Sequence, residues 1–202
     1  QALSALPFPT LSPQAGEAME QEILRARQAG DSVGGILETA VTGLPPGLGE
    51  PFFASVESQL AALLFSIPGV KGLEFGSGFR LAAMQGSQAN DPFRMEDGKV
   101  VTATNHNGGV NGGITNGMPL LFSTVVKPTP SIYQPQATVN LAAGENATLQ
   151  IRGRHDPCIA HRAAVVQDSL TALCLGDLLN QALGLAWQKG AVWPKEAPWN
   201  TD

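Results

Sequence analysis

Charged side chains are scarce in this sequence. Lysine, arginine, aspartate and glutamate make up 14% of its 202 residues, whereas an ordinary soluble domain carries about 25%. The 12 basic and 17 acidic residues leave a formal net charge of −5. This balance argues against broad nucleic-acid binding, because a surface that tracks phosphates needs a large basic excess. Any anion-binding site must therefore be local.

Long apolar runs and cysteines are also scarce. No run approaches the roughly 18 apolar residues of a membrane span, and residues 1–13 lack a basic segment followed by an apolar one. We therefore expect a soluble, cytoplasmic protein. The two cysteines, Cys158 and Cys174, are too few and too badly spaced for a disulfide framework or a zinc site. We expect both to be reduced and packed.

Glycine and proline, in contrast, are abundant. The 23 glycines and 15 prolines imply many fixed turns and close backbone approaches, and 43% apolar residues supply enough material for a core. Periodicity and turn residues predict an α/β fold with the following elements. In the first half they are a helix over 13–29, a β-type run over 32–41, a structured loop over 42–51, a helix from Pro51 to Ile67, and strands over 70–75 and 79–83.

The second half is predicted to begin with a long polar loop. The expected elements are a loop over 84–107 with a brief strand at 100–103, a β-rich run over 118–126, a hairpin of 138–142 with 147–151, a helix over about 159–189, and an irregular tail over 190–202. Loops of such length are more often functional or mobile than accidental.

The segment 107–117 holds five glycines in eleven residues. Backbone amides that no side chain shields can cradle a phosphate or approach a planar ring. The segment is not a P-loop, because Met118 and Pro119 stand where that motif has Lys and Ser or Thr. Two interpretations remain: a structural turn, or a loop that lines a ligand site.

Lys127-Pro128-Thr129-Pro130-Ser131 offers an ammonium group, two hydroxyls and a backbone stiffened by two prolines. A rigid strand end of this kind suits a phosphate ester. A proline-rich strand exit without a ligand is the alternative.

The densest polar cluster is Arg152-Gly-Arg-His-Asp-Pro-Cys158, directly before the predicted long helix. The helix dipole adds positive potential there, and Arg154 could bind a carboxylate or phosphate through two hydrogen bonds. Asp156 could accept a proton, or it could simply cap the helix. The cluster therefore indicates an anion site, with helix capping as the alternative.

A metal site is the less favoured interpretation of the same region. His155 and His161 are six residues apart with Asp156 and Cys158 between them, which would suit a metal-dependent hydrolase. A strand-to-helix junction, however, aims such side chains in different directions, and the spacing matches no zinc motif. His106 lies in a loop rich in glycine and asparagine, where a histidine is more often an ordinary polar loop residue than a catalyst.

Several unusual motifs in a fixed order carry a resemblance to a known family. They are Gly30-Asp-Ser-Val-Gly-Gly35, Gly43-Leu-Pro-Pro-Gly-Leu-Gly-Glu-Pro51, Lys71-Gly-Leu-Glu-Phe-Gly76, Gly86-Ser87 with Asn90-Asp91, Thr104-Asn-His-Asn-Gly-Gly109, Gly112-Gly-Ile114, Lys127–Ser131 and Gly153-Arg-His-Asp-Pro-Cys158. From about residue 30 to 175 the sequence resembles chorismate synthase. The resemblance covers the carboxy-terminal part of that family, whose Gly-Glu-Ser-His-Gly signature, second histidine and arginine-rich segments have no counterpart here.

The resemblance implies a fold and a reaction. The family fold is a β-α-β sandwich with long helices packed on mixed sheets, assembled as a homotetramer. The family uses reduced FMN, without net redox change, to eliminate phosphate from 5-enolpyruvylshikimate 3-phosphate and give chorismate. We therefore expect residues 1–202 to be a single carboxy-terminal portion of such a carbon–oxygen lyase, truncated and inactive by itself. The alternative is a non-catalytic portion that serves subunit contacts and keeps only part of a flavin and phosphate site.

The resemblance also assigns site residues. Asp156 corresponds to the family's aspartate implicated in proton handling near the flavin. The flavin-contacting residues would be Pro68, Gly69, Gly112, Lys127, Pro128, Thr129, Pro130, Ser131 and Arg154. At the first two positions the family commonly has Asn-Ala. No metal ligand and no nucleic-acid or membrane contact is expected.

Overall fold

The computed structural model describes residues 3, 6 and 8–184. They divide into two compact units, which are described separately. Unit 1 comprises residues up to 37, 68–71 and 125–165, and unit 2 comprises 38–67, 72–124 and residues from 166 onward. Within the described part of the chain, no helix is long and apolar enough to cross a membrane. The predicted tail over 190–202 lies outside the described residues.

The first helix of unit 1 forms as the sequence predicts. Helix α1 runs over Pro13–Gln28, with Ser12 as its N-cap and proline in its first turn. The Ser12 hydroxyl oxygen accepts the backbone N–H of Ala15 at 3.3 Å, which satisfies one donor that the helix start leaves free.

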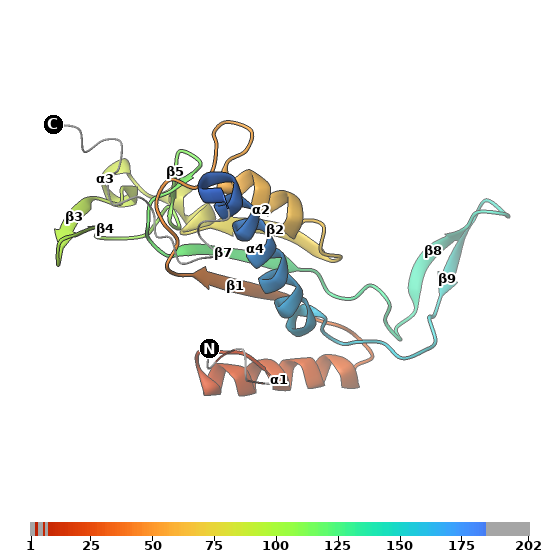
Figure 1. Cartoon of the computed structure of the whole chain (residues 1–202). Helices are drawn as coiled ribbons and strands as arrows, with labels where there is room; N and C mark the ends of the chain where they lie inside the picture. The colour runs from red at the N-terminus through yellow and green to blue at the C-terminus, as the bar shows by residue number, and fades with distance from the viewer. Residues whose placement is uncertain (1–2, 4–5, 7, 185–202) are drawn as a thin grey trace. The chain divides into compact units, whose positions relative to one another are not determined.

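A three-stranded sheet has the order β1-β7-β2 and consists of Gly35–Val41, Leu120–Val126 and Val70–Phe75 (Figure 1). The central strand β7 alternates buried and more exposed residues, as expected for a strand with one face in the core. In unit 2 that face carries Leu120, Phe122 and Thr124, each at most 1% exposed. All three strands lie within runs that the sequence predicts as β structure.

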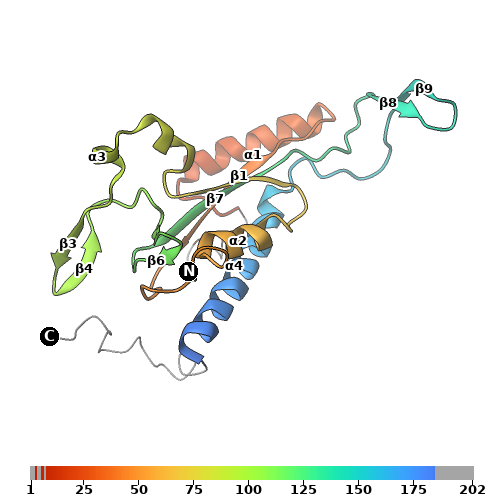
Figure 2. The same ribbon diagram turned by 90° about the horizontal axis from the view of Figure 1, so that it is seen from above.

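Two helices contribute further side chains to the unit 2 core. Helix α2 covers Val56–Leu64, and α4 covers Ala160–Leu183, of which residues from 166 belong to unit 2. Figure 2 shows this part of α4 beside α2. The buried apolar side chains contributed by the two helices include Val56, Leu60, Leu64, Cys174, Leu175 and Leu178.

The predicted start of the second helix, at Pro51, is wrong. Helix α2 begins after Ser55, whose hydroxyl oxygen accepts the N–H of Ser58 at 3.1 Å. Phe52 and Phe53 precede this cap and are 90% and 95% exposed, so they are not part of the helix's apolar face. The Ser55 side chain satisfies a backbone N–H at the start of the helix, whereas the Pro51 side chain can accept no hydrogen bond. The helix therefore begins after Ser55.

The predicted strand over 79–83 is also wrong. Residues Gly78–Ala83 form a short 3₁₀ helix. Gly76 and Gly78 both have positive φ, +56° and +50°, and the Glu74 carboxylate accepts the N–H of Phe79 at 3.2 Å. The chain turns at these glycines instead of continuing as a strand.

The predicted loop over 84–107 has more structure than expected. It holds a one-turn helix, α3 at Gly86–Ala89, and the hairpin of β3, Phe93–Glu96, with β4, Lys99–Thr102. The brief predicted strand is thus confirmed as β4. The turn between the strands is Asp97-Gly98, with φ of +51° and +72°, the combination that two-residue hairpin turns favour.

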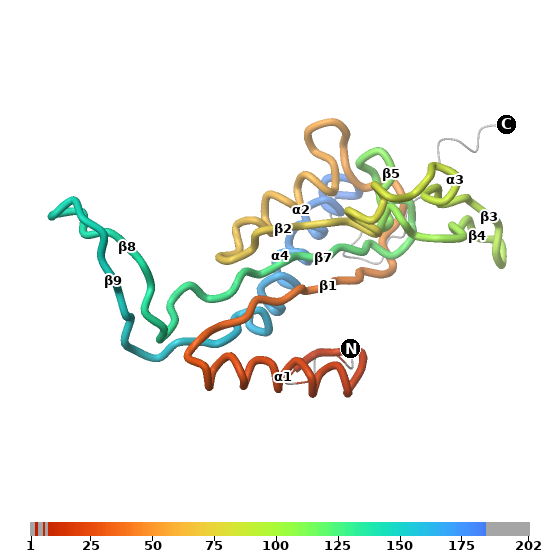
Figure 3. The backbone as a smooth tube through the Cα atoms, turned by 180° about the vertical axis from the view of Figure 1, so that it is seen from behind, coloured from red at the N-terminus to blue at the C-terminus, as the bar shows by residue number. Residues whose placement is uncertain are grey.

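Two further antiparallel hairpins complete the fold. In unit 2, β5 at Val110–Asn111 pairs with β6 at Ile114–Thr115. In unit 1, β8 at Gln136–Asn140 pairs with β9 at Glu145–Leu149, and Figure 3 shows the connections that lead to it. The second hairpin was predicted two residues too late. Its turn starts early because the Asn140 side-chain oxygen accepts the N–H groups of Ala142 and Ala143.

The long helix is confirmed from its start to residue 183, while the predicted part over 185–189 lies outside the described residues. Both cysteines are free and buried, as expected.

Candidate functional site

The segment 127–131 leaves strand β7 beside Gly69. The backbone N–H of Lys127 donates to the carbonyl oxygen of Gly69 at 2.8 Å. Gly69 has φ of +94°, and a Cβ atom at this position would lie 3.2 Å from Ile159. Unit 1 therefore brings together two segments that the sequence nominates for flavin contact, Pro68-Gly69 and Lys127–Ser131.

Residues 32–34 join this segment to the Arg154 segment. The Ser32 hydroxyl donates to the carbonyl oxygen of Thr129 at 2.6 Å, and the N–H of Val33 donates to the carbonyl oxygen of Pro157 at 2.8 Å. At Gly34, a Cβ atom would lie 2.5 Å from the carbonyl oxygen of Val126. The backbone of residues 32–34 therefore lies close to the end of strand β7 at Gly34. The role of Ser32 and Val33 as a link was not predicted.

Asp156 has two partners within unit 1. Its carboxylate accepts the N–H of Cys158 at 3.1 Å and forms an ion pair with Arg162 in the first turn of α4. Asp156 does not cap the helix backbone, because α4 begins at Ala160 and the carboxylate instead closes a turn at Cys158, ahead of the helix. The same contacts fix the carboxylate's position close to Arg154 in the chain.

Tyr133 also supports the Arg154 segment. Its hydroxyl donates to the carbonyl oxygen of Gly153 at 2.5 Å, and its ring meets that of His155 edge to face, with ring centres 4.6 Å apart. Its backbone N–H donates to the carbonyl oxygen of Gly30 at 3.0 Å. Sequence reasoning missed this residue, although it is the only tyrosine in the chain.

Several polar groups of unit 1 have capacity for a ligand. The Thr129 hydroxyl oxygen and His155 Nε2 are buried and have no hydrogen-bond partner. Arg154 is exposed, and among the described residues neither it nor Lys127 forms an ion pair. Lys127 and Thr129 thus lie in one segment, and Arg154 and His155 lie in another, and Ser32 and Val33 connect the two segments. These groups suit an anionic ligand that also has hydrogen-bonding groups.

Gly112 is the one nominated residue outside unit 1. It lies in the turn of the β5–β6 hairpin in unit 2, with φ of +58° and open space where a Cβ atom would stand. The glycine-rich segment 107–117 is thus a tight hairpin whose turn leaves the backbone accessible.

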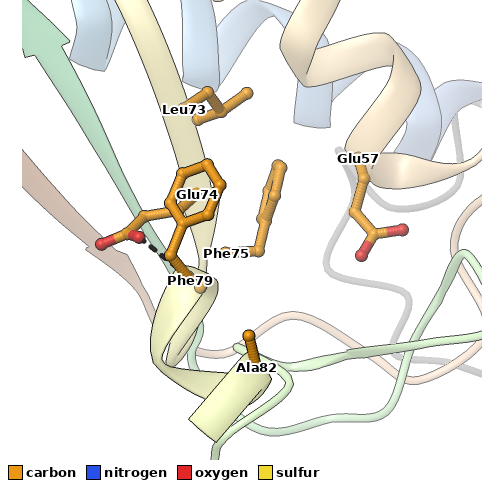
Figure 4. Close-up of a pocket in the computed structure, with 7 residues that line it drawn as sticks. Glu57, Leu73, Glu74, Phe75, Phe79 and Ala82 are labelled. Atoms are coloured by element: carbon orange, nitrogen blue, oxygen red, sulfur yellow. Dashed lines mark hydrogen bonds between the residues drawn. The ribbon is translucent and has the colours of Figure 1, made fainter.

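A separate pocket of about 430 Å³ lies in unit 2 and contains none of the nominated residues (Figure 4). Its lining consists of Glu57, Leu73, Glu74, Phe75, Gly78, Phe79 and Ala82. Burial raises the pKa of the Glu57 carboxyl above its ordinary value. A mostly apolar wall with few polar groups is typical of a contact surface as well as of a ligand site.

The region of His155, Asp156 and His161 does not assemble metal ligands. Among the residues that the structure describes, no group of three His, Cys, Asp or Glu side chains could hold a metal ion. The ring of His161 lies near that of Phe8, with centres 6.5 Å apart, and His155 packs on Tyr133.

The fold and these contacts define an α/β protein with a candidate anion-binding site where a strand end and a helix start meet. A family model described as chorismate synthase matches residues 1–179. The chorismate synthase of Thermococcus kodakarensis is 56% identical over 163 residues, which are 81% of this chain and 46% of that relative. The chorismate synthase of Methanothermobacter thermautotrophicus is 47% identical over 177 residues, 87% of this chain and 47% of that relative.

A solved structure agrees with the sequence matches. A crystal structure of chorismate synthase superposes with a TM-score of 0.69 at 29% identity, covering 85% of this chain and 44% of that one. The chain belongs to the chorismate synthase family. It spans about half the length of the curated relatives it matches.

Proposed function

We propose that this chain provides part of an FMN-dependent chorismate synthase, which eliminates phosphate from 5-enolpyruvylshikimate 3-phosphate to give chorismate. The observation that carries the proposal is the convergence in unit 1 of Gly69, the 127–131 segment and the Arg154 segment through the contacts of Lys127, Ser32 and Val33. Family membership supports the same reaction. We also propose that the chain has the family's β-α-β sandwich fold and functions within a cytoplasmic homotetramer.

The residues present fit the flavin that the family uses. Reduced FMN supplies electron density that no side chain can offer. The unpaired Thr129 hydroxyl and His155 Nε2 and the free cations of Lys127 and Arg154 match a group that combines a phosphate with a polar ring. Pro68, Gly69, Pro128, Pro130 and Ser131 would shape the surrounding wall in unit 1. For unit 2, the family resemblance implies flavin contact at Gly112, in the β5–β6 turn.

Charge on the chain serves the proposed elimination. Besides holding the flavin, Lys127 and Arg154 would add positive potential to the site, which favours departure of the substrate's phosphate because negative charge increases on the leaving oxygen. Asp156 would hold or move a proton next to Arg154, with its carboxylate oriented by Cys158 and Arg162. Preset orientation lowers the cost of bringing such a group to the reacting atoms.

Titration of the 202-residue chain with FMN, followed by flavin fluorescence, tests the proposal. We expect binding in the micromolar range, about tenfold weaker for Arg154→Ala. A matched control is Arg94→Ala, because Arg94 lies in the exposed β3–β4 hairpin and, within the described part of the chain, its ion pair is with Glu96 of the same hairpin. No binding at millimolar FMN would contradict the proposal and favour the alternative, a non-catalytic portion that serves subunit contacts.

The exposed Phe52 and Phe53 are the feature that favours this alternative, since adjacent exposed aromatic rings are typical of contact surfaces. Analytical sedimentation of Phe53→Ser beside the parent chain tests whether these rings contribute to subunit contacts. Smaller species in the variant than in the parent chain would support the alternative.

A further inference from the structure

The carboxylate of Asp91 organises the turn that leads into the glycine-rich segment. Asp91 is only 8% exposed. Its Oδ1 atom accepts the backbone N–H of His106 and the hydroxyl of Thr104, both at 2.7 Å, and its Oδ2 atom accepts the N–H of Asn107 at 2.8 Å. Three donors from the four consecutive residues 104–107 thus converge on one side chain.

The same turn is held on its other side by Ser77. The backbone N–H of Ser77 donates to the carbonyl oxygen of His106 at 2.7 Å, and the Ser77 hydroxyl and His106 Nδ1 are 2.8 Å apart. Gly76 permits this approach, because a Cβ atom there would collide with the backbone of His106 and Gly108. The turn is therefore fixed between a buried carboxylate and a glycine-dependent backbone contact.

Hydrogen bonds continue from this turn to Gly112. The N–H of Gly108 donates to Asn105, and the carbonyl oxygen of Gly109 accepts the N–H of Asn116 at 3.0 Å. Residues 110 and 111 then pair with 115 and 114, which places Gly112 in the connecting turn. The position of Gly112 thus depends on where residues 106–109 are held.

The charge on Asp91 suits this role. Burial acts to raise the pKa of Asp91, but the hydrogen bonds from Asn107, Thr104 and His106, together with the nearby His106 ring, outweigh burial and lower the pKa below its ordinary value. The carboxylate is therefore ionised in the folded chain at neutral pH, and hydrogen bonds to an ionised acceptor are stronger than those to a neutral one.

We propose that Asp91 is a positioning residue for the cofactor-binding hairpin: its carboxylate fixes the 104–107 turn and so holds Gly112 ready for the flavin. This inference rests on the proposed function, because flavin contact at Gly112 is part of it. A loop fixed in advance needs less ordering when the ligand arrives, so affinity depends on the residue that fixes it.

The test compares Asp91→Asn, Thr104→Val and the control Asp97→Asn, whose carboxylate lies exposed in the β3–β4 turn. An asparagine keeps the size of Asp91 but has one acceptor oxygen and no charge. We expect Asp91→Asn to weaken FMN binding about tenfold and Thr104→Val about threefold, with Asp97→Asn within twofold of the parent. Amide hydrogen exchange should accelerate at His106 and Asn107 in the first variant only.

The outcomes separate the two proposals. If the parent chain binds FMN and a folded Asp91→Asn binds equally well, the positioning role is wrong while the proposed function stands. If the parent chain itself binds no FMN at millimolar concentration, both are wrong. If Asp91→Asn does not fold, Thr104→Val decides, because it removes only one of the three hydrogen bonds: unchanged affinity in that variant overturns the positioning role.

Discussion

The hydroxyl of Thr124 donates a hydrogen bond to Oε1 of Gln167 at 2.5 Å, and both side chains are 1% exposed. The amide nitrogen of Gln167 also donates to the Thr39 hydroxyl at 2.9 Å. Within unit 2, a single glutamine of helix α4 thus links strands β7 and β1 through the core. A buried polar group of this kind favours one arrangement of helix and sheet, since any shift leaves its partners unpaired.

Replacing this glutamine should destabilise the fold. Gln167→Leu leaves the Thr124 and Thr39 hydroxyls without their partner, so the free energy of unfolding should fall by about 1–3 kcal/mol. Urea denaturation measures the change. Gln181→Leu is the control, because Gln181 is exposed and, among the described residues, its side chain bonds Asp177 in the preceding turn. If the two variants lose equal stability, the buried hydrogen bonds do not contribute.

Gly34→Ala should damage the proposed flavin site. The new methyl group would lie 2.5 Å from the Val126 carbonyl oxygen and 3.1 Å from Pro128, so the 127–131 segment must move. We expect a loss of about 1–3 kcal/mol of stability and weaker FMN binding in the same titration. The control is Gly86→Ala, where nothing lies within 4 Å of the added atom, so stability and FMN binding should stay unchanged. Unaltered FMN binding in Gly34→Ala would show that the close contact between Gly34 and Val126 is not needed for the site.

Gly176→Ala should stabilise the chain. Gly176 lies inside helix α4, and a Cβ atom there meets nothing within 4 Å. Alanine restricts the unfolded backbone and favours the helix, so stability should rise by about 0.5–1 kcal/mol. A rise in the midpoint of urea unfolding would confirm this, and a fall would mean that the position is packed more tightly than the structure shows.

Glu57 should make stability depend on pH. Burial raises its pKa above the ordinary value of 4.5, so the folded state favours the protonated form. Its contribution is fully present below pH 4.5 and is lost as the pH rises through the raised pKa of the folded state. Glu57→Gln should remove this loss. The free energies of unfolding of the parent and the variant should therefore differ more above the raised pKa than below pH 4.5. Parallel stability curves from pH 4 to 8 would contradict the prediction.

Cys174 should be inert in the folded chain. Burial, with a smaller effect of Asp177, raises the pKa of its thiol to about 11, so only about one group in a thousand is ionised at pH 8. Ellman's reagent should therefore react with Cys174 only after denaturation. Cys174→Ala identifies the signal of this thiol, and rapid labelling of Cys174 in the native chain would refute its burial.

Local signals predicted much of the fold. Ser12 and Pro13 define the start of α1, and the apolar runs over 70–75 and 120–126 form strands β2 and β7, because the information lies within a few residues of each element. Errors arose where one side chain redirected the backbone. Ser55 delays the start of α2, and Asn140 advances the turn of the β8–β9 hairpin.

The sequence by itself determined the family, because its unusual motifs recur in a fixed order and the family model matches residues 1–179. The sequence also indicated the candidate ligand-binding segments 107–117, 127–131 and 152–158. Only the tertiary structure decided which residues connect them. Ser32 meets Thr129 across 97 residues of sequence, and Asp91 meets the 104–107 turn. Such contacts depend on how segments distant in sequence pack together, so they cannot be predicted from local periodicity or residue propensity.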